Sequence, residues 1–207
     1  MSPEEWALLK AVALGSLVAW ASGLRLYLVV FALGLAARLG YLTLPDGLEI
    51  LSHSYVIAAA GVLLAVEFLA DKVPGIDSAW DALHTFIRIP AGAFLAAGVA
   101  GDDLTAITVA AGLLGGTITA GTHLAKAGGR AAINTSPEPV SNWIASFTED
   151  ATVLGGIWVA LNYPLVFMAS LAVFIAFAAW FVIAFARFVR ARLVRTSAQP
   201  GTHAGLR

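Results

Sequence analysis

The sequence predicts an all-α protein, a bundle of about six transmembrane helices, from two observations. Of the 207 residues, 59% are hydrophobic and only 12% are charged, whereas soluble domains carry about 45–50% apolar and about 25% charged residues. Apolar stretches of roughly 20 residues, enough to cross a bilayer core about 30 Å thick, also recur along the chain. This composition, with a mean hydropathy of +0.85, excludes a soluble enzyme, a nucleic-acid-binding module and a disordered chain.

The order of the helices follows from the apolar segments and from the polar, glycine and proline residues between them. The first segment is too long for one simple span and is interrupted at Ala21-Ser22-Gly23, and the third contains Pro90. We expect both breaks to unwind the backbone locally. The spans are expected at residues 6–39, 55–71, 77–100, 104–127, 140–161 and 164–187. Together they form a single transmembrane domain over residues 1–200, with a flexible C-terminal tail over residues 196–207.

Basic residues predict the orientation of the chain, because cytoplasmic loops are enriched in Lys and Arg. The arginines that follow the last span place the C-terminus in the cytoplasm; they are Arg187, Arg190, Arg192 and Arg195. About six crossings then place the N-terminus on the same side. We therefore expect a multi-pass protein of the bacterial cytoplasmic (inner) membrane with both termini cytoplasmic. The chain has no cysteine, which excludes disulfides and thiol chemistry.

A short internal repeat relates two halves of the chain, about 5–100 and 101–195. Residues 21–26 (Ala-Ser-Gly-Leu-Arg-Leu) resemble residues 119–124 (Thr-Ala-Gly-Thr-His-Leu), and residues 67–71 (Glu-Phe-Leu-Ala-Asp) resemble residues 146–150 (Ser-Phe-Thr-Glu-Asp). An odd number of spans in each half inserts the halves in opposite orientations, which is typical of secondary transporters. The alternative is that glycine- and alanine-rich helices resemble one another by composition alone.

Charged residues inside the apolar segments mark a candidate site, because a charge at mid-bilayer costs about 2.5–3.5 kcal/mol and usually faces the bundle interior. The residues expected to bind an ion or substrate are the carboxylates Glu67, Asp71, Glu149 and Asp150. The residues expected to balance their charge are Arg25, Lys72 and Lys126. The alternative is that these groups form structural ion pairs, with Arg130 a terminal residue that reaches the membrane surface.

The third segment also has a polar stripe at helical spacing. The residues expected to form this stripe or to relay protons are Asp77, Asp81, His84, Arg88 and, in the fourth segment, His123. The alternative is an amphipathic helix lying on the cytoplasmic surface of the membrane. The two histidines together with carboxylates can also ligate a metal ion, whose identity the sequence leaves unknown.

Several stretches together resemble a known family. Residues 67–74 (Glu-Phe-Leu-Ala-Asp-Lys-Val-Pro) are followed by Asp77, Asp81, residues 84–88 (His-Thr-Phe-Ile-Arg) and residues 91–93 (Ala-Gly-Ala). Residues 22–25 (Ser-Gly-Leu-Arg) and 123–127 (His-Leu-Ala-Lys-Ala) fit the same pattern. From about Leu9 to Arg195 the chain resembles the bacterial membrane family catalogued as domain of unknown function 4126. Ile89 departs from the pattern, where a second proline-like break is expected. The resemblance implies little about activity.

The function expected is that of a small secondary transporter or channel for an ion, not an enzyme, with a cation favoured and proton coupling expected. By analogy, the acidic motifs are similar to those of cation exchangers. We expect no cofactor and no nucleic acid; the expected partners are the lipid bilayer, a small ion and, as an option, a second copy in a homodimer. The alternatives are a structural or accessory membrane protein, a protein that handles lipid headgroups with the polar stripe, and a carrier whose anion binds Arg25, Lys126 and Arg130.

Overall fold

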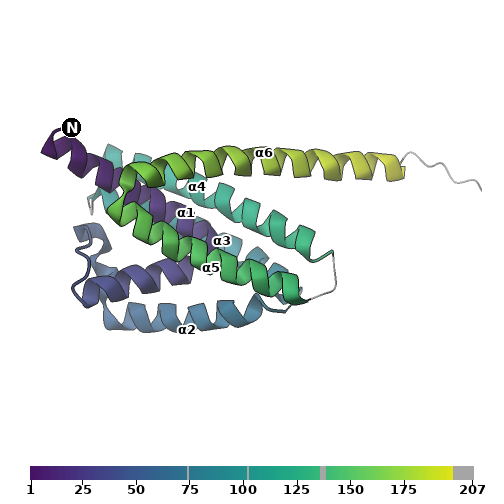
Figure 1. The fold of residues 1–207 in the computed structure, drawn as a ribbon, viewed down its shortest axis with the longest axis horizontal. Helices are drawn as coiled ribbons and strands as arrows, with labels where there is room; N and C mark the ends of the chain where they lie inside the picture. Colours follow the sequence, from purple (N-terminus) through teal and green to yellow (C-terminus); the bar gives the residue numbers. More distant parts are fainter. Residues whose placement is uncertain (74, 102, 136–138, 198–207) are drawn as a thin grey trace, which may run out of the picture.

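The computed structural model describes residues 1–197 except Pro74, Asp102 and residues 136–138. The described residues form α-helices and one 3-10 helix, η1, and contain no strand (Figure 1). The helices are α1 (Pro3–Arg38), η1 (Asp46–Ser52), α2 (Ser54–Ala70), α3 (Ile76–Ala100), α4 (Ala106–Ile133), α5 (Pro139–Asn162) and α6 (Pro164–Ser197). The all-α prediction is confirmed, and the tail expected to be flexible lies outside the described residues from residue 198 onward.

By length and composition, 5 helices among the described residues are able to cross a membrane: α1, α3, α4, Val140–Asn162 of α5 and Pro164–Phe188 of α6. The number rises to 6 if η1 and α2, which meet at an angle of 67°, are counted as one broken span. The expected boundaries of the second to sixth segments agree with α2 to α6 to within a few residues at most ends, α4 continuing to Ile133 and α6 to Ser197.

Several helices begin where the sequence supplies a capping residue or a proline. Ser2 Oγ accepts a hydrogen bond from the Glu5 N–H while the Glu5 carboxylate accepts one from the Ser2 N–H, so α1 begins with a capping box. Pro164 begins α6, a position where its missing N–H leaves no helical bond unmade. Pro90, by contrast, lies inside a continuous α3, so the unwinding expected there is wrong.

The first helix is broken at Arg25, whose backbone angles (φ −146°, ψ 73°) are not helical. Before the break, α1 runs parallel to α4: Ala19 O accepts a hydrogen bond from Thr119, and Leu24 O accepts one from Lys126. The non-helical residue lies close to the predicted break at residues 21–23, two positions beyond Gly23.

After the break, α1 runs antiparallel to α2. Phe31 lies against Gly61 near the middle of α2, and Arg38 donates to Ser52 O just before α2 begins. Since α2 and α4 run in the same direction, with their C-terminal ends at the same end of the bundle, α1 must turn back at Arg25. Both ends of α1 accordingly lie at the left-hand end of Figure 1.

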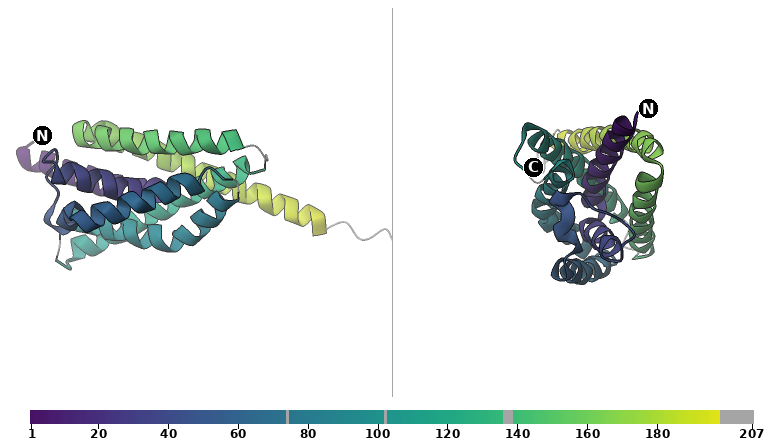
Figure 2. Two further views of the ribbon diagram at one scale, coloured as in Figure 1. Left: turned by 90° about the horizontal axis from the view of Figure 1, so that it is seen from below. Right: turned by 90° about the vertical axis from the view of Figure 1, so that its left-hand side faces the viewer.

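The turn in α1 corrects the expected topology. The N-terminus lies at the left-hand end of the bundle and the end of α6 at the right-hand end, where α6 projects beyond the other helices (Figures 1 and 2). The expectation that both termini lie on one face of the membrane is therefore not confirmed. It counted the first segment as a complete crossing, whereas α1 begins at the opposite end of the bundle from the end of α6.

The inverted repeat is not confirmed. Its first matched stretch lies at the broken part of α1, whereas the counterpart around His123 lies in a continuous α4. An inverted repeat needs an odd number of crossings in the first half. Because α1 turns back, only α2 and α3 remain as crossings in that half, which is an even number. The two matched stretches do pack on each other: a Cβ added at Gly23 would lie 2.6 Å from Thr119 O, so only glycine permits this approach.

The core is built around α1. Seen along the bundle, the other helices are arranged around it (Figure 2, right). Its buried apolar side chains, including Leu17, Leu24 and Leu33, pack mainly on α3, α4 and α5. This arrangement places the break at Arg25 inside the bundle, away from lipid.

Candidate functional site

Arg25 is the centre of a buried ion-pair network. Its side chain is fully buried, and its Nη1 contacts Asp71 Oδ2 at the end of α2. On the α5 side, its Nε lies 2.8 Å from Asp150 Oδ1 and 3.4 Å from Glu149 Oε2. Its Nη2 donates to Ser146 O (3.0 Å) and Ser146 Oγ (2.7 Å). The turn of α1 is thus held between α2 and α5 by one guanidinium group.

Arg88 of α3 forms a second centre. Its Nη2 donates to Glu67 Oε1, and its Nη1 donates to Asp81 Oδ1 at 2.8 Å. The same Nη1 lies 3.2 Å from His123 Nδ1, so Nδ1 acts as the acceptor and the neutral ring keeps its proton on Nε2. That nitrogen lies 2.7 Å from Thr85 Oγ1.

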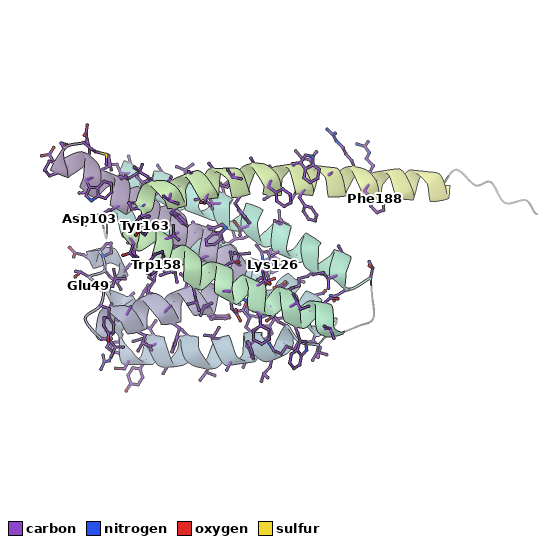
Figure 3. The ribbon with its side chains drawn as sticks, in the orientation of Figure 1. Glu49, Asp103, Lys126, Trp158, Tyr163 and Phe188 are labelled. Atoms are coloured by element: carbon purple, nitrogen blue, oxygen red, sulfur yellow. The ribbon has the colours of Figure 1, made fainter. Side chains whose placement is uncertain are left out.

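Lys126 joins the two centres. Its Nζ lies 3.3 Å from Asp81 Oδ1, 3.8 Å from Glu67 Oε1 and 3.4 Å from Glu149 Oε2. It also donates to Leu24 O beside the break in α1 (3.0 Å). In Figure 3, Lys126 lies between α4 and α5. Carboxylates from α2, α3 and α5 therefore share one ammonium group.

Arg130 completes the network, although its place near the end of the fourth segment also suggested a terminal residue at the membrane surface. Its Nε donates to Glu149 Oε1 at 3.0 Å, its Nη2 lies 3.6 Å from Asp71 Oδ2, and its Nη1 donates to Asn142 O at 3.1 Å. Ser146 and Asn142 were missed as well. The signal for Arg130 was its spacing, since His123, Lys126 and Arg130 share one face of α4.

These nine side chains form what we call the charged cluster: Arg25, Glu67, Asp71, Asp81, Arg88, Lys126, Arg130, Glu149 and Asp150. Its five carboxylates face four basic groups, so the fully ionised cluster has one negative charge in excess. Each carboxylate keeps one oxygen without a hydrogen-bond partner among the described residues. The side chains of Glu149 and Asp150 are 16% and 21% exposed, whereas those of the other carboxylates are 2% exposed or less.

The four carboxylates predicted to bind an ion therefore all belong to the charged cluster. The cluster also contains four other residues predicted from the sequence: Arg25, Lys126, Asp81 and Arg88. His123 contacts the cluster through Arg88. Asp77 and His84 lie apart from the charged cluster. Asp77 accepts hydrogen bonds from the Gly75 and Ser78 N–H groups and from Asn134 Nδ2, and so ties the start of α3 to the end of α4. His84 stacks on Trp80, with ring centroids 4.0 Å apart.

Lys72 is also separate from the charged cluster, and the ion pair expected of it with the carboxylates is not seen among the described residues. Its Nζ lies 3.1 Å from the centroid of the Phe68 ring and donates to Phe68 O, and the described residues offer it no carboxylate within ion-pair distance. Lys72 follows the end of α2, and burial, aided by the charge of Arg25, lowers the pKa of its ammonium group below the usual 10.5. Charge balance is supplied by Arg88 and Arg130 instead.

The polar stripe of α3 faces inward. Asp77, Asp81, His84 and Arg88 are all buried, whereas their helix exposes Leu83, Phe86 and Phe94. An amphipathic helix lying on the membrane surface would expose the polar stripe, so that alternative does not fit. Among the described residues, no group of three His, Cys, Asp or Glu side chains is placed to hold a metal ion.

The model of the family described as "Domain of unknown function (DUF4126)" matches residues 12–184. Among the curated proteins and the solved structures, none matches this chain. The family match covers every residue of the charged cluster and the break in α1.

Proposed function

The chain belongs to the DUF4126 family, and we propose that this member is a small secondary transporter or channel whose charged cluster takes up a cation, a proton above all. The observation that supports this most is the excess of one carboxylate over the basic groups around Arg25. A buried cluster with one uncompensated negative charge is stabilised when it binds one positive charge.

The position of the cluster supports the same proposal. Irregular backbone at membrane depth is tolerated where it is buried in protein or lines a polar path, and broken helices form the sites of many transporters. The break in α1 brings Arg25 to carboxylates of α2 and α5. A movement of α1 would therefore change the partners of several carboxylates together.

Asp150 is the carboxylate we propose as the first to take up the proton. It has the most exposed side chain of the five, and Arg25 is its one ion-pair partner among the described residues. Glu149, the next most exposed, has ion pairs with Arg25, Lys126 and Arg130. Protonation of Asp150 would release Arg25 toward Glu149 and Asp71.

We also propose an orientation in a bacterial cytoplasmic membrane. Lys72 follows the end of α2, and Arg187 and Arg190 lie in the part of α6 that reaches the right-hand end of Figure 1, whereas Glu4 lies at the start of α1 and Glu49 and Asp103 lie at the left-hand end (Figure 3). The excess of basic residues on the cytoplasmic side then places the C-terminus in the cytoplasm and the N-terminus outside.

The test is ion flux in proteoliposomes that contain a pH-sensitive dye, with a membrane potential imposed by potassium and valinomycin. The proposal predicts potential-driven proton entry for the wild type and a loss of at least about ten-fold in Asp150→Asn. Glu49→Gln is the matched control, because it removes an exposed carboxylate far from the charged cluster. Sodium, calcium, manganese and chloride are screened in the same vesicles. Equal flux in the wild type and Asp150→Asn, or no flux of any cation, contradicts the proposal.

A second candidate is a structural role, which the ion-pair contacts of Arg25 with four carboxylates favour. In that case the double exchange Arg25→Asp with Asp150→Arg restores a stable protein with unchanged cellular function. The transporter proposal predicts that this exchange restores stability without restoring flux.

A further inference from the structure

A cavity of about 310 Å³ lies between α4, α5 and α6, beside the charged cluster. One wall has the polar residues Lys126, Arg130 and Glu149, and the α6 wall has the rings of Phe174, Phe177 and Phe181. Its volume is at the lower end of the range of about 300–1,000 Å³ that is usual for small-molecule sites. It therefore joins an aromatic surface directly to the ion-pair network.

Among the three charged side chains that line this cavity, Lys126, Arg130 and Glu149, the acidic one is the most exposed. The Glu149 side chain is 16% exposed, against 0% for Lys126 and 2% for Arg130. Both basic groups are held by carboxylates and by backbone oxygens, those of Leu24 and Asn142. Glu149 Oε2 lies 3.4 Å from Lys126 Nζ and from Arg25 Nε but accepts no hydrogen bond from the described residues, so it keeps its capacity to accept one.

The aromatic wall favours a positive ligand as well, because the faces of aromatic rings attract cations, most strongly away from water. The rings of Phe177 and Phe181 are nearly parallel, with an interplanar angle of 21° and centroids 6.5 Å apart. An apolar wall excludes a small hydrated ion, since nothing there replaces its water. A ligand that suits both walls has one positive charge covered by apolar groups.

We propose that this cavity binds hydrophobic organic monocations, such as quaternary ammonium compounds, between Glu149 and the phenylalanine rings of α6. The inference rests on the proposed function, which it deepens by naming a second substrate class. One excess negative charge is neutralised by one proton or by one organic cation. The proton and the organic cation therefore compete for the charged cluster. Such competition is required of a protein that exchanges protons for organic cations across a membrane.

The binding test uses the full-length protein in detergent micelles, with benzyltrimethylammonium as the probe and equilibrium dialysis as the measurement. We expect Glu149→Gln and Phe177→Ala each to weaken binding by about ten-fold. Phe86→Ala is the matched control and leaves affinity unchanged, since Phe86 is an 82% exposed residue of α3 and does not line the cavity. The neutral isostere 2,2-dimethylpropylbenzene does not compete, and calorimetry in two buffers detects proton release on binding.

Equal affinity in Phe177→Ala and the wild type overturns the inference, as does equal competition by the neutral isostere or by phenylacetate. If Glu149→Gln does not fold, the isostere comparison decides, because it needs no variant. Proton flux that depends on Asp150, without benzyltrimethylammonium binding, overturns the inference and leaves the proposed function intact. Binding that meets these criteria without proton flux supports the site and contradicts the proposed function.

Discussion

Arg25 Nε lies 2.8 Å from Asp150 Oδ1, so the turn in the first helix is tied directly to a carboxylate in the middle of α5. Arg25 is fully buried and Asp150 is the more exposed partner. The conformation of α1 and the ionisation of the charged cluster are coupled at this contact.

Replacing Arg25 by Met is expected to destabilise the protein by about 3–5 kcal/mol, because removal of one partner leaves several buried carboxylates uncompensated. The measurement is thermal unfolding of the detergent-solubilised protein. Arg38→Met is the control at the exposed end of α1, with an expected effect within about 0.5 kcal/mol. Similar stability losses in the two variants would contradict the role given to Arg25.

Gly23→Ala is expected to destabilise the protein by about 1–3 kcal/mol through overpacking. The added Cβ would lie 2.6 Å from Thr119 O, a backbone atom that cannot move without shifting α4. Gly121→Ala is the matched control, since nothing lies within 4 Å of its added Cβ. That substitution is expected to be neutral or stabilising by up to about 1 kcal/mol. A neutral Gly23→Ala variant would show that α1 and α4 are not in close contact there.

Asp77→Ala is expected to lower stability by about 1–3 kcal/mol while leaving cation uptake unchanged. Its carboxylate bonds the backbone at the start of α3 and Asn134 of α4 but does not reach the charged cluster. Asp81→Asn, four residues further along the same helix face, removes a member of the charged cluster and should reduce uptake. Proteoliposome flux with thermal unfolding on the same samples separates the two, and loss of flux in folded Asp77→Ala would contradict the assignment.

Lys72 is expected to titrate below the usual pKa of 10.5, because burial and the charge of Arg25 both disfavour its ammonium form. Since the unfolded chain then binds more protons than the folded one just below pH 10.5, this group adds stability as the pH rises through that interval. Reductive methylation with ¹³C followed by NMR titration measures the value, and Lys72→Arg assigns the signal. Titration at or above 10.5 would contradict the prediction.

The helices were predictable from the sequence because each depends on a long apolar run with clear boundaries, as Ser54–Ala70 and Pro164–Ser197 illustrate. The turn of α1 was not, because it depends on the backbone angles of one residue, and Leu24 and Leu26 beside it are ordinary helix residues. Gly23 predicted a break two residues before the observed one. In the structure, the missing side chain of Gly23 instead allows α1 to approach Thr119 O of α4.

The sequence alone identified the acidic residues of the candidate site and some of its basic residues. A carboxylate inside an apolar segment is conspicuous in a sequence, so Glu67, Asp71, Glu149 and Asp150 were identified directly. Arg130 lies near the end of its segment, where an arginine usually reaches the membrane surface. Its ion pairs depend on how closely α4, α5 and the end of α2 approach one another, which is a property of the packing.

The turning back of α1 at Arg25 both brings this residue into the charged cluster and places the start of α1 and the end of α6 at opposite ends of the bundle. Since the chain has no cysteine, single cysteines can be introduced at Glu4, Glu49 and Arg190 and labelled in intact cells with a membrane-impermeant maleimide. The structure predicts that cysteines at 4 and 49 react from one side of the membrane and cysteine 190 only from the other. Reaction of cysteines 4 and 190 from the same side, with cysteine 49 on the opposite side, would show that α1 crosses the membrane and does not turn back at Arg25.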